Sequence, residues 1–309
     1  MATGIDIVFA THNGERTLPR MLAALKAIAP PRRPWRVVAV DNASTDRSAA
    51  LLREAAGDLP MLVLACAEPG KMPALKAAAK HLSGDLVVFT DDDVEPSPVW
   101  LQAYEAAADR ASDQVGVFGG PITPTPLEEL SPWFALSRRH HAELFALTDQ
   151  PDGPVDAEAH IYGPNFLIRR RHLDVLDTIA SGVGPTFAAG KRRTFAMGED
   201  SLIVARVASR GAGAVYVRDA RVGHLVRRFQ TELPFMLDRA ERHGRGAAIR
   251  DLAGKPGAIS RRVRLVLQNA LGAGAPNRAD AEPSAETFER LWRARWKLGA
   301  VKAALFDTP

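Results

Sequence analysis

Cysteine is nearly absent from the 309 residues, and this scarcity excludes several kinds of protein. The single cysteine, Cys66, can form no disulfide within the chain and cannot build a zinc site from several thiolates. A chain of this length buries an adequate core without such cross-links. One unpaired thiol is typical of a reducing compartment, so we expect a cytoplasmic protein.

Long apolar runs are missing as well. None approaches the about 18 residues that a membrane-spanning helix needs. The first residues, Met1 to Asp6, lack the basic and apolar regions of a secretion signal. We therefore expect no spanning segment, and at most peripheral contact with the inner face of a membrane.

Three glycine-based signatures are also lacking. G-x-G-x-x-G does not follow the first apolar run, and neither G-x-x-x-x-G-K-[ST] nor G-x-S-x-G occurs. These absences argue against a dinucleotide oxidoreductase, a P-loop ATPase and a serine hydrolase with a nucleophile elbow.

Charge is present but unevenly distributed. Residues 1–217 carry 22 basic and 26 acidic side chains, whereas residues 218–309 carry 18 basic and 10 acidic ones. The basic C-terminal part suits contact with a phosphorylated substrate, an anionic lipid or nucleic acid. A solvated basic surface would give the same count.

Apolar runs alternate with helical patterns over the first hundred residues. The predicted strands are 5–10, 36–40, 61–65 and 85–90, and the predicted helices between them are 18–28, 45–56 and 71–82. The runs are continuous, as in parallel strands that are buried on both faces and joined by crossover helices. The pattern predicts an α/β fold with a mostly parallel sheet flanked by helices.

The remainder is less regular. Strands are expected at 115–118, 161–168, 214–217 and 221–224, and helices at 100–111, 132–147 and 199–210. Residues 122–126 are rich in Pro and Thr, which predicts no regular element there. Residues 182–194 are expected to form a loop. Beyond residue 230 the pattern is helical and basic, with a break at 272–283.

Three adjacent carboxylates, Asp91, Asp92 and Asp93, directly follow the fourth predicted strand. Ligands of open α/β sheets bind at the carboxyl ends of strands. The three charges repel one another unless a cation neutralises them, and a divalent ion can also bridge to a diphosphate. A solvated acidic turn that caps the next helix is the alternative interpretation.

Polar clusters follow two other strands. Asp41 ends the second strand, and the first is followed by Thr11, Asn13 and Glu15. Each cluster alone is compatible with turn formation and helix capping. Because several such clusters follow strands at the sheet edge where ligands bind, the pattern favours a ligand-binding site there. Further candidates lie downstream: Gly198-Glu199-Asp200 opens a helix, His224 ends a strand, and Arg227 and Arg228 suit a diphosphate.

Five segments in order resemble the family 2 glycosyltransferases with the GT-A fold, over about residues 5–230. They are VFATHNGERTLPRML, VVAVDNASTDRSAALL, GKMPALKAAAKHLSGDLVVFTDDDVEPSPVWL, YGPNFLIRRRHL and MGEDSLIVARVASRGAGAVYVRDARVGHLV. The resemblance implies a glycosyltransferase domain over 1–230, with a nucleotide half to about residue 118 and an acceptor half from about 119. A helical extension would follow over 231–309.

The resemblance also implies an activity and roles for residues. A sugar would pass from a nucleoside diphosphate sugar, with UDP-sugars favoured, to a hydroxyl of a saccharide or lipid-linked acceptor, with inversion. The nucleotide would contact Thr11, Asn13, Glu15, Asp41, Lys71, Asp91 and Asp92.

The same resemblance implies a metal site and a base. Asp93 and His224 would hold Mn2+ or Mg2+ on the diphosphate. Asp200 would be the general base, supported by Glu199. No Q-x-x-R-W segment is present, which argues against a processive synthase.

Several alternatives remain. A nucleotidyltransferase needs a Gly-rich phosphate loop after the first strand, which THNGERTLPR is not. A non-catalytic scaffold predicts gaps in the acidic set, yet Asp41, Asp93 and Asp200 are all present. A nucleic-acid binder would need a recognition module that is absent, so we expect no nucleic-acid partner.

The basic C-terminal part carries two tryptophans at i, i+4 spacing, Trp292 and Trp296. Trp among Lys and Arg suits an anionic membrane surface. The same spacing is also that of one helix face packed on the catalytic domain, which we favour.

Overall fold

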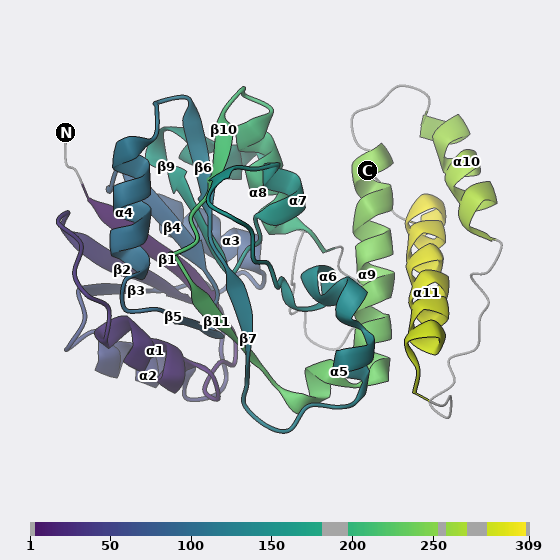
Figure 1. The fold of residues 1–309 in the computed structure, drawn as a ribbon, viewed down its shortest axis with the longest axis horizontal. Helices are drawn as coiled ribbons and strands as arrows, with labels where there is room; N and C mark the ends of the chain where they lie inside the picture. The colour runs from purple at the N-terminus through teal and green to yellow at the C-terminus, as the bar shows by residue number, and fades with distance from the viewer. Residues whose placement is uncertain (1–3, 181–196, 253–257, 271–282, 307–309) are drawn as a thin grey trace. The chain divides into compact units, whose positions relative to one another are not determined.

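The computed structural model describes residues 4–180, 197–252, 258–270 and 283–306 (Figure 1). Its contacts divide the chain into two compact units. The first comprises Met1–Thr125, Ala146–Lys191 and Glu199–Leu225, and the second comprises Pro126–Phe145, Arg192–Gly198 and Val226–Pro309. Residues 126–145 thus group with the C-terminal helices, and the functional division at residue 230 stays a prediction. The predicted loop at 182–194 and nearly all of the predicted break at 272–283 lie outside the described residues.

An eight-stranded sheet forms the centre of the first unit. Its strands are β1 (Ile5–Thr11), β2 (Trp35–Asp41), β3 (Met61–Ala65), β4 (Leu86–Thr90), β6 (Val115–Gly119), β8 (Gly153–Pro154), β9 (Asn165–Arg169) and β10 (Gly213–Tyr216). Their order is β3-β2-β1-β4-β9-β6-β10-β8. Strands β1 to β4 are parallel, while β9 runs antiparallel between β4 and β6.

Helices cover both faces of this sheet. One face packs on α1 (Leu18–Lys26), α2 (Ser48–Ala55) and α4 (Trp100–Arg110). The other packs on α3 (Lys71–Ala79), α7 (Ala157–His160), the 3-10 helix η2 (Arg170–Thr178) and α8 (Glu199–Ala208). Along β1, Ile7 and Phe9 lie in the first core and Val8 lies in the second. Burial on both faces explains the continuous apolar runs and confirms the predicted α/β fold.

A smaller sheet corrects one expectation. Its three strands are β5 (Val94–Pro96), β7 (Ile122–Pro126) and β11 (Val222–Val226), in the order β5-β11-β7. The prediction of no regular element at 122–126 was therefore wrong. Strand β7 lies at the edge of the sheet, where Pro124 and Pro126 can be accommodated although they have no N–H to donate.

The second unit is helical. Residues 132–147 do not form the single predicted helix but three short pieces: α5 (Trp133–Leu136), the 3-10 helix η1 (Arg138–His140) and α6 (His141–Phe145). The Ser137 hydroxyl donates to the Phe134 carbonyl (3.0 Å), a local bond that competes with regular helix. Ala146, with a φ of 57°, follows the last piece.

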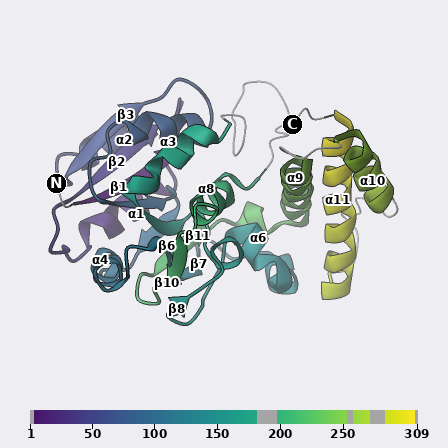
Figure 2. The ribbon, with the colours of Figure 1, turned by 90° about the horizontal axis from the view of Figure 1, so that it is seen from above.

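Long helices make up the rest of this unit: α9 (Leu233–Leu252), α10 (Ala258–Ala270) and α11 (Ala285–Phe306), after the 3-10 helix η3 (Arg228–Thr231). Helices α9 and α11 lie side by side (Figures 1 and 2). They approach closely at Gly244, where a Cβ would lie 1.9 Å from the Trp296 carbonyl oxygen. Among the described helices, none is long and apolar enough to cross a membrane.

Trp292 is 4% exposed and stacks on His140, with ring centroids 4.3 Å apart. Trp296 is partly buried against Ala248 and Ala300. Packing of both rings is as predicted, but these partners belong to the second unit and not to the sheet.

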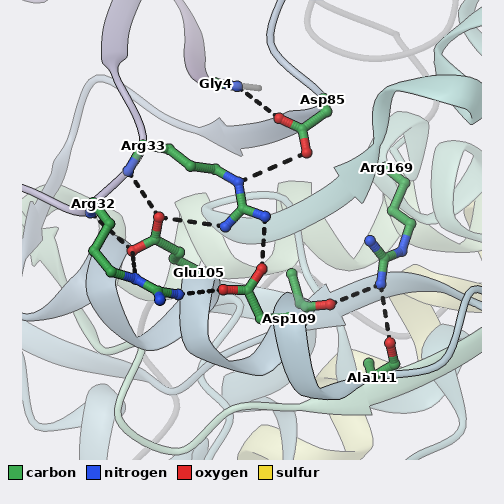
Figure 3. Close-up of polar contacts among 9 residues, drawn as sticks. Gly4, Arg32, Arg33, Asp85, Glu105, Asp109, Ala111 and Arg169 are labelled. Carbon is green, nitrogen blue, oxygen red and sulfur yellow. Dashed lines mark hydrogen bonds and ion pairs between the residues drawn. The ribbon is translucent and has the colours of Figure 1, made fainter. Parts of the chain in front are cut away.

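A charged cluster ties the turn before β2 to α4 (Figure 3). Glu105 is 3% exposed and accepts from the backbone N–H groups of Arg32 (2.9 Å) and Arg33 (2.8 Å). The Arg33 guanidinium also reaches Glu105 (3.3 Å), Asp109 (2.6 Å) and Asp85 (3.8 Å). The cluster fixes the chain that enters β2.

The same contacts perturb the titration of two carboxylates. The hydrogen bond from Arg33 lowers the pKa of Asp109 below its usual value. Burial would raise the pKa of Glu105, but the backbone N–H groups of Arg32 and Arg33 outweigh it and lower that pKa. Because both folded-state pKa values are depressed, the unfolded state binds more protons in acid. The stability they contribute is therefore present above about pH 4 and lost as the pH falls through the folded pKa values.

We predict that Glu105→Ala lowers the free energy of unfolding by about 3 kcal/mol, because two N–H groups lose their buried acceptor and Arg33 loses a partner. Urea unfolding at neutral pH measures this. Glu54→Ala, an exposed helical glutamate, is the matched control and should stay within about 0.5 kcal/mol of the unsubstituted protein. The Glu105 variant should also lose less stability on acidification. Equal stability of the two variants would contradict the role of the cluster.

Candidate active site

The ends of three parallel strands bring the predicted polar clusters to one edge of the sheet. Thr11 and Asp41 are direct partners at the ends of β1 and β2. The Thr11 hydroxyl donates to the carboxylate of Asp92, which follows β4. Such an edge of an α/β sheet is where ligands bind.

Lys71, at the start of α3, lies between two carboxylates that are far apart in the sequence. Its Nζ is 2.7 Å from Asp91 Oδ1 and 3.0 Å from Asp200 Oδ2. The three side chains are 14%, 26% and 19% exposed, so water screens them only partly. The ammonium neutralises charges that would otherwise repel each other, and it connects α8 to the strand ends.

Gly163 leaves the space that Asp200 occupies. A Cβ at residue 163 would lie 1.8 Å from Asp200 Oδ2, so any side chain there would displace the carboxylate. The tight segment Gly163-Pro164-Asn165, which interrupts the predicted strand 161–168, therefore has a packing role beside the candidate base.

Asp93 and His224 are brought together by the small sheet. His224 pairs with Val94 across β11 and β5, and its Nε2 lies 3.3 Å from Asp93 Oδ2. The backbone N–H of Leu225 donates to the Asp93 carbonyl (2.7 Å). The structure thus brings together two residues that the family resemblance implies act together, while their role as metal ligands stays a prediction.

This pair offers a divalent ion one carboxylate oxygen and one imidazole nitrogen. Among the described residues, no group of three or more His, Cys, Asp or Glu side chains is placed to hold an ion. Mg2+ commonly binds through one or two protein carboxylates and completes its shell with substrate phosphates and water. Asp93 and His224 therefore fit a metal that arrives with a diphosphate.

The other predicted nucleotide contacts are engaged in turns. Asn13 Oδ1 accepts from the backbone N–H of Thr45 (2.8 Å), and a Glu15 carboxylate oxygen accepts from that of Arg47 (3.2 Å). Asp41 Oδ1 accepts from the N–H of Ser44 (3.3 Å). The bonds of Asn13 and Glu15 join the loops after β1 and β2, whereas that of Asp41 lies within the turn after β2. Contact of these side chains with a nucleotide stays a prediction.

Three predicted residues are not described together with this cluster. The side chain of Glu199 lies outside the described part of the structure. Arg227 and Arg228 belong to the second unit, where Arg227 lies 4.8 Å from the Phe229 ring centroid and Arg228 Nε lies 3.7 Å from Glu232. Their assignment to a diphosphate remains a prediction.

Asn42 is a positioning residue that the sequence analysis treated only as part of a turn. It is 2% exposed, and its Nδ2 donates to the carbonyls of Cys66 (3.1 Å) and Glu68 (2.7 Å). Its Oδ1 accepts from the N–H of Gly70 (2.7 Å). The amide thereby fixes the chain immediately before Lys71. The sequence feature that could have identified this residue is an asparagine placed directly after a predicted buried strand.

Asn165, fully buried at the start of β9, was also missed. Its Oδ1 accepts from Trp100 Nε1 and the Tyr104 hydroxyl, both at 2.8 Å. Its Nδ2 donates to the carbonyls of Pro121 (3.1 Å) and Ala220 (2.7 Å). This amide joins α4, β9 and the chain before β11. The sequence feature that could have identified Asn165 is a polar residue immediately before the apolar run Phe-Leu-Ile.

Comparisons with known proteins place this geometry in context. A family model described as "Glycosyl transferase family 2" matches residues 6–177. The undecaprenyl-phosphate 4-deoxy-4-formamido-L-arabinose transferase of Edwardsiella ictaluri (strain 93-146) is 33% identical over 116 residues, which is 36% of each chain. The protein of that name from Pectobacterium atrosepticum is 33% identical over 119 residues, again 36% of each chain. The chain thus matches about a third of the length of these curated relatives.

Solved structures share the fold. The mannosyltransferase PcManGT from Pyrobaculum calidifontis, in complex with GDP-Man and Mn2+, has a TM-score of 0.60 and 22% identity; the match covers 99% of this chain and 88% of that one. S. aureus TarS 1-349 in complex with UDP-GlcNAc has a TM-score of 0.53 and 14% identity, with 97% and 91% covered. At these identities the likeness concerns the fold alone.

We predict that Lys71→Met lowers the free energy of unfolding by about 2 kcal/mol, because Asp91 and Asp200 are left facing each other without a counter-ion in a partly buried site. Thermal and urea unfolding measure the change. Lys76→Met, on the same helix, is the matched control and should leave stability nearly unchanged. A Lys71 variant as stable as the control would show that the ammonium does not balance these carboxylates.

Proposed function

Because the chain belongs to glycosyl transferase family 2, it is a glycosyltransferase, and we propose that it moves a sugar from a nucleoside diphosphate sugar to an acceptor hydroxyl with inversion. Its mostly parallel sheet, covered by helices on both faces, has the GT-A fold. The observation that carries the proposal is the bridge from Asp91 through Lys71 to Asp200, at the sheet edge that also holds Asp41 and Asp93.

The donor's nucleotide is proposed to lie over the ends of β1, β2 and β4. Asp41 is proposed to meet the base or ribose. Its strand partner Thr11 donates to Asp92, which is proposed as a further nucleotide contact. Uridine is the base that the family resemblance favours. Solved neighbours contain both GDP-Man and UDP-GlcNAc, so the binding experiment below compares several bases.

Asp200 is the proposed general base. Its carboxylate accepts the proton of the acceptor hydroxyl as that oxygen attacks the anomeric carbon, and the bond to the diphosphate breaks. Lys71 stabilises the charge that develops on the leaving diphosphate. A bound diphosphate gives the ammonium a more highly charged partner than Asp200. We therefore expect donor binding to weaken the Lys71–Asp200 pair and free the base.

Asp93 and His224 are the residues that would hold a divalent ion, Mn2+ or Mg2+. When bound, such an ion supplies Lewis-acid stabilisation of the diphosphate. The carboxylate of Asp93 would provide the negative charge for this role, and His224, 9% exposed in its side chain, would add an imidazole nitrogen that lies 3.3 Å from Asp93 Oδ2.

The acceptor is proposed to be saccharide or lipid-linked, with the lipid-linked class favoured because the curated relatives are named as undecaprenyl-phosphate transferases. A peripheral position on the inner face of a membrane would suit this acceptor. We propose addition of one sugar or a few. A non-catalytic scaffold that binds nucleotide sugars is the alternative, and the transfer assay below separates the two.

We predict that Asp93→Asn abolishes the metal-dependent part of nucleotide binding, about tenfold or more in affinity, because an anionic metal ligand is lost. Calorimetric titration with UDP, GDP, CDP and dTDP, each with Mn2+ and with EDTA, measures this. Asp219→Asn, an exposed aspartate of the first unit, is the control. Equal binding by the Asp93 variant in Mn2+ and by the unsubstituted protein would remove the metal assignment.

We predict that Asp200→Asn keeps nucleotide binding but lowers transfer by about 100- to 10,000-fold, since the amide cannot accept the proton. The assay follows labelled sugar from the nucleotide sugar selected by titration to free saccharides and to undecaprenyl-linked saccharides, both of which present an acceptor hydroxyl. Retained turnover would place the base elsewhere. Nucleotide binding without transfer to any acceptor, even by the unsubstituted protein, would favour the scaffold.

A further inference from the structure

A cleft of about 1020 Å³ opens within the second unit, and none of its lining residues is assigned to the transfer reaction above. One wall is formed by residues 135–140, from α5 and η1, and the other by residues 285–297 of α11. A volume of this size accommodates a small organic ligand.

The cleft concentrates positive charge. Five Arg and Lys side chains line it, against two glutamates: Arg138, Arg139, Arg290, Arg293, Lys297, Glu286 and Glu289. Glu289 is already engaged by His140 (2.7 Å) and by Arg293. Arg138, Arg139 and Arg290 are exposed and form no ion pair with any described residue. Like charges held together without counter-ions destabilise the fold unless an anion binds there.

The lining is also partly apolar. Leu136, Phe288 and Ala294 contribute to it. Phe288 is 1% exposed and stands between Trp133 and Trp292, with ring centroids 6.2 and 6.0 Å away. This aromatic packing holds the two walls together. Ala135 and Leu136 are apolar lining residues that stay at least partly exposed in the cleft that the guanidinium groups also line.

We propose that this cleft binds the phosphate headgroup of an anionic lipid, with the arginines on the phosphate and the start of the acyl chain on the apolar lining. Guanidinium groups bind phosphate oxygens in a bidentate manner. The apolar lining favours a lipid over free phosphate. The proposal rests on the membrane contact proposed above and names its site.

A second observation points to a lipid. Of the six large apolar side chains that are exposed in the described residues, five lie in the second unit: Phe229, Val263, Leu267, Leu305 and Phe306. Arg262 donates to the Ala304 carbonyl (2.9 Å) and so joins the exposed positions of α10 to the end of α11. Exposed apolar side chains among basic ones suit an interfacial surface.

The test uses the full chain, without donor or acceptor, and vesicles of phosphatidylcholine with or without phosphatidic acid. Arg138→Gln combined with Arg290→Gln removes two unpaired cleft charges. Arg53→Gln combined with Arg110→Gln removes two exposed charges from the first unit and is the matched control. We expect the cleft variant to bind phosphatidic acid vesicles about 30-fold more weakly, from about 1 kcal/mol per basic residue, and the control to bind nearly as the unsubstituted protein does.

Thermal unfolding accompanies the binding measurement. The cleft variant should melt no lower than the unsubstituted protein, because like-charge repulsion is relieved. Equal weakening in both variants, or displacement of the protein from vesicles by millimolar inorganic phosphate, would overturn the proposal. So would the absence of vesicle binding by the unsubstituted protein. Nucleotide binding by calorimetry is independent of these results, so failure here leaves the proposed transfer reaction standing.

Discussion

The candidate site depends on neutralising carboxylates that the sheet topology forces together. Parallel strands β1, β2 and β4 end at one edge, and the start of α8 adds Asp200 to it. The ammonium of Lys71 makes this concentration of negative charge tolerable, because it lies within 3.0 Å of two carboxylates. A diphosphate with its metal could exchange partners in such a network without leaving a charge unpaired. Stability and proposed chemistry therefore share one ion pair.

Buried amides set the geometry of that network. Asn42 holds the backbone of Cys66, Glu68 and Gly70 in the segment before α3. The position of Lys71 therefore follows from hydrogen bonds to backbone rather than from its own long side chain. Asn165 joins α4 to β9 and to the chain that leads into His224. Neutral amides are suited to this task since both ends are satisfied without introducing further charge. Gly163 completes the arrangement by leaving room for Asp200.

The second unit differs from the first in how its helices pack and in what its surface exposes. Its helices pack through aromatic rings and close glycine contacts, and its surface keeps unpaired arginines and exposed apolar side chains. Such a surface contributes little to the free energy of folding. Like charges repel one another, and apolar side chains that stay exposed to water provide no hydrophobic stabilisation. An anionic lipid would satisfy both kinds of group at once. A glycosyltransferase with a lipid-linked acceptor would thus gain a membrane contact distinct from its reaction centre.

The sequence by itself determined the α/β class, the four parallel strands and the acids at their ends, because burial on both faces leaves continuous apolar runs and polar residues must follow them. It also paired Asp93 with His224, through the family resemblance. Tertiary structure alone decided that Lys71 bridges Asp91 and Asp200, since those residues come from α3, the segment after β4, and α8, and lie up to 129 positions apart. It alone formed β7 from a Pro-rich segment, because an edge strand tolerates missing donors. It also determined how the three short pieces formed from the helix predicted at 132–147 pack, since Trp133 lies against Phe288 of α11. Periodicity describes one element at a time, whereas these features depend on which elements meet.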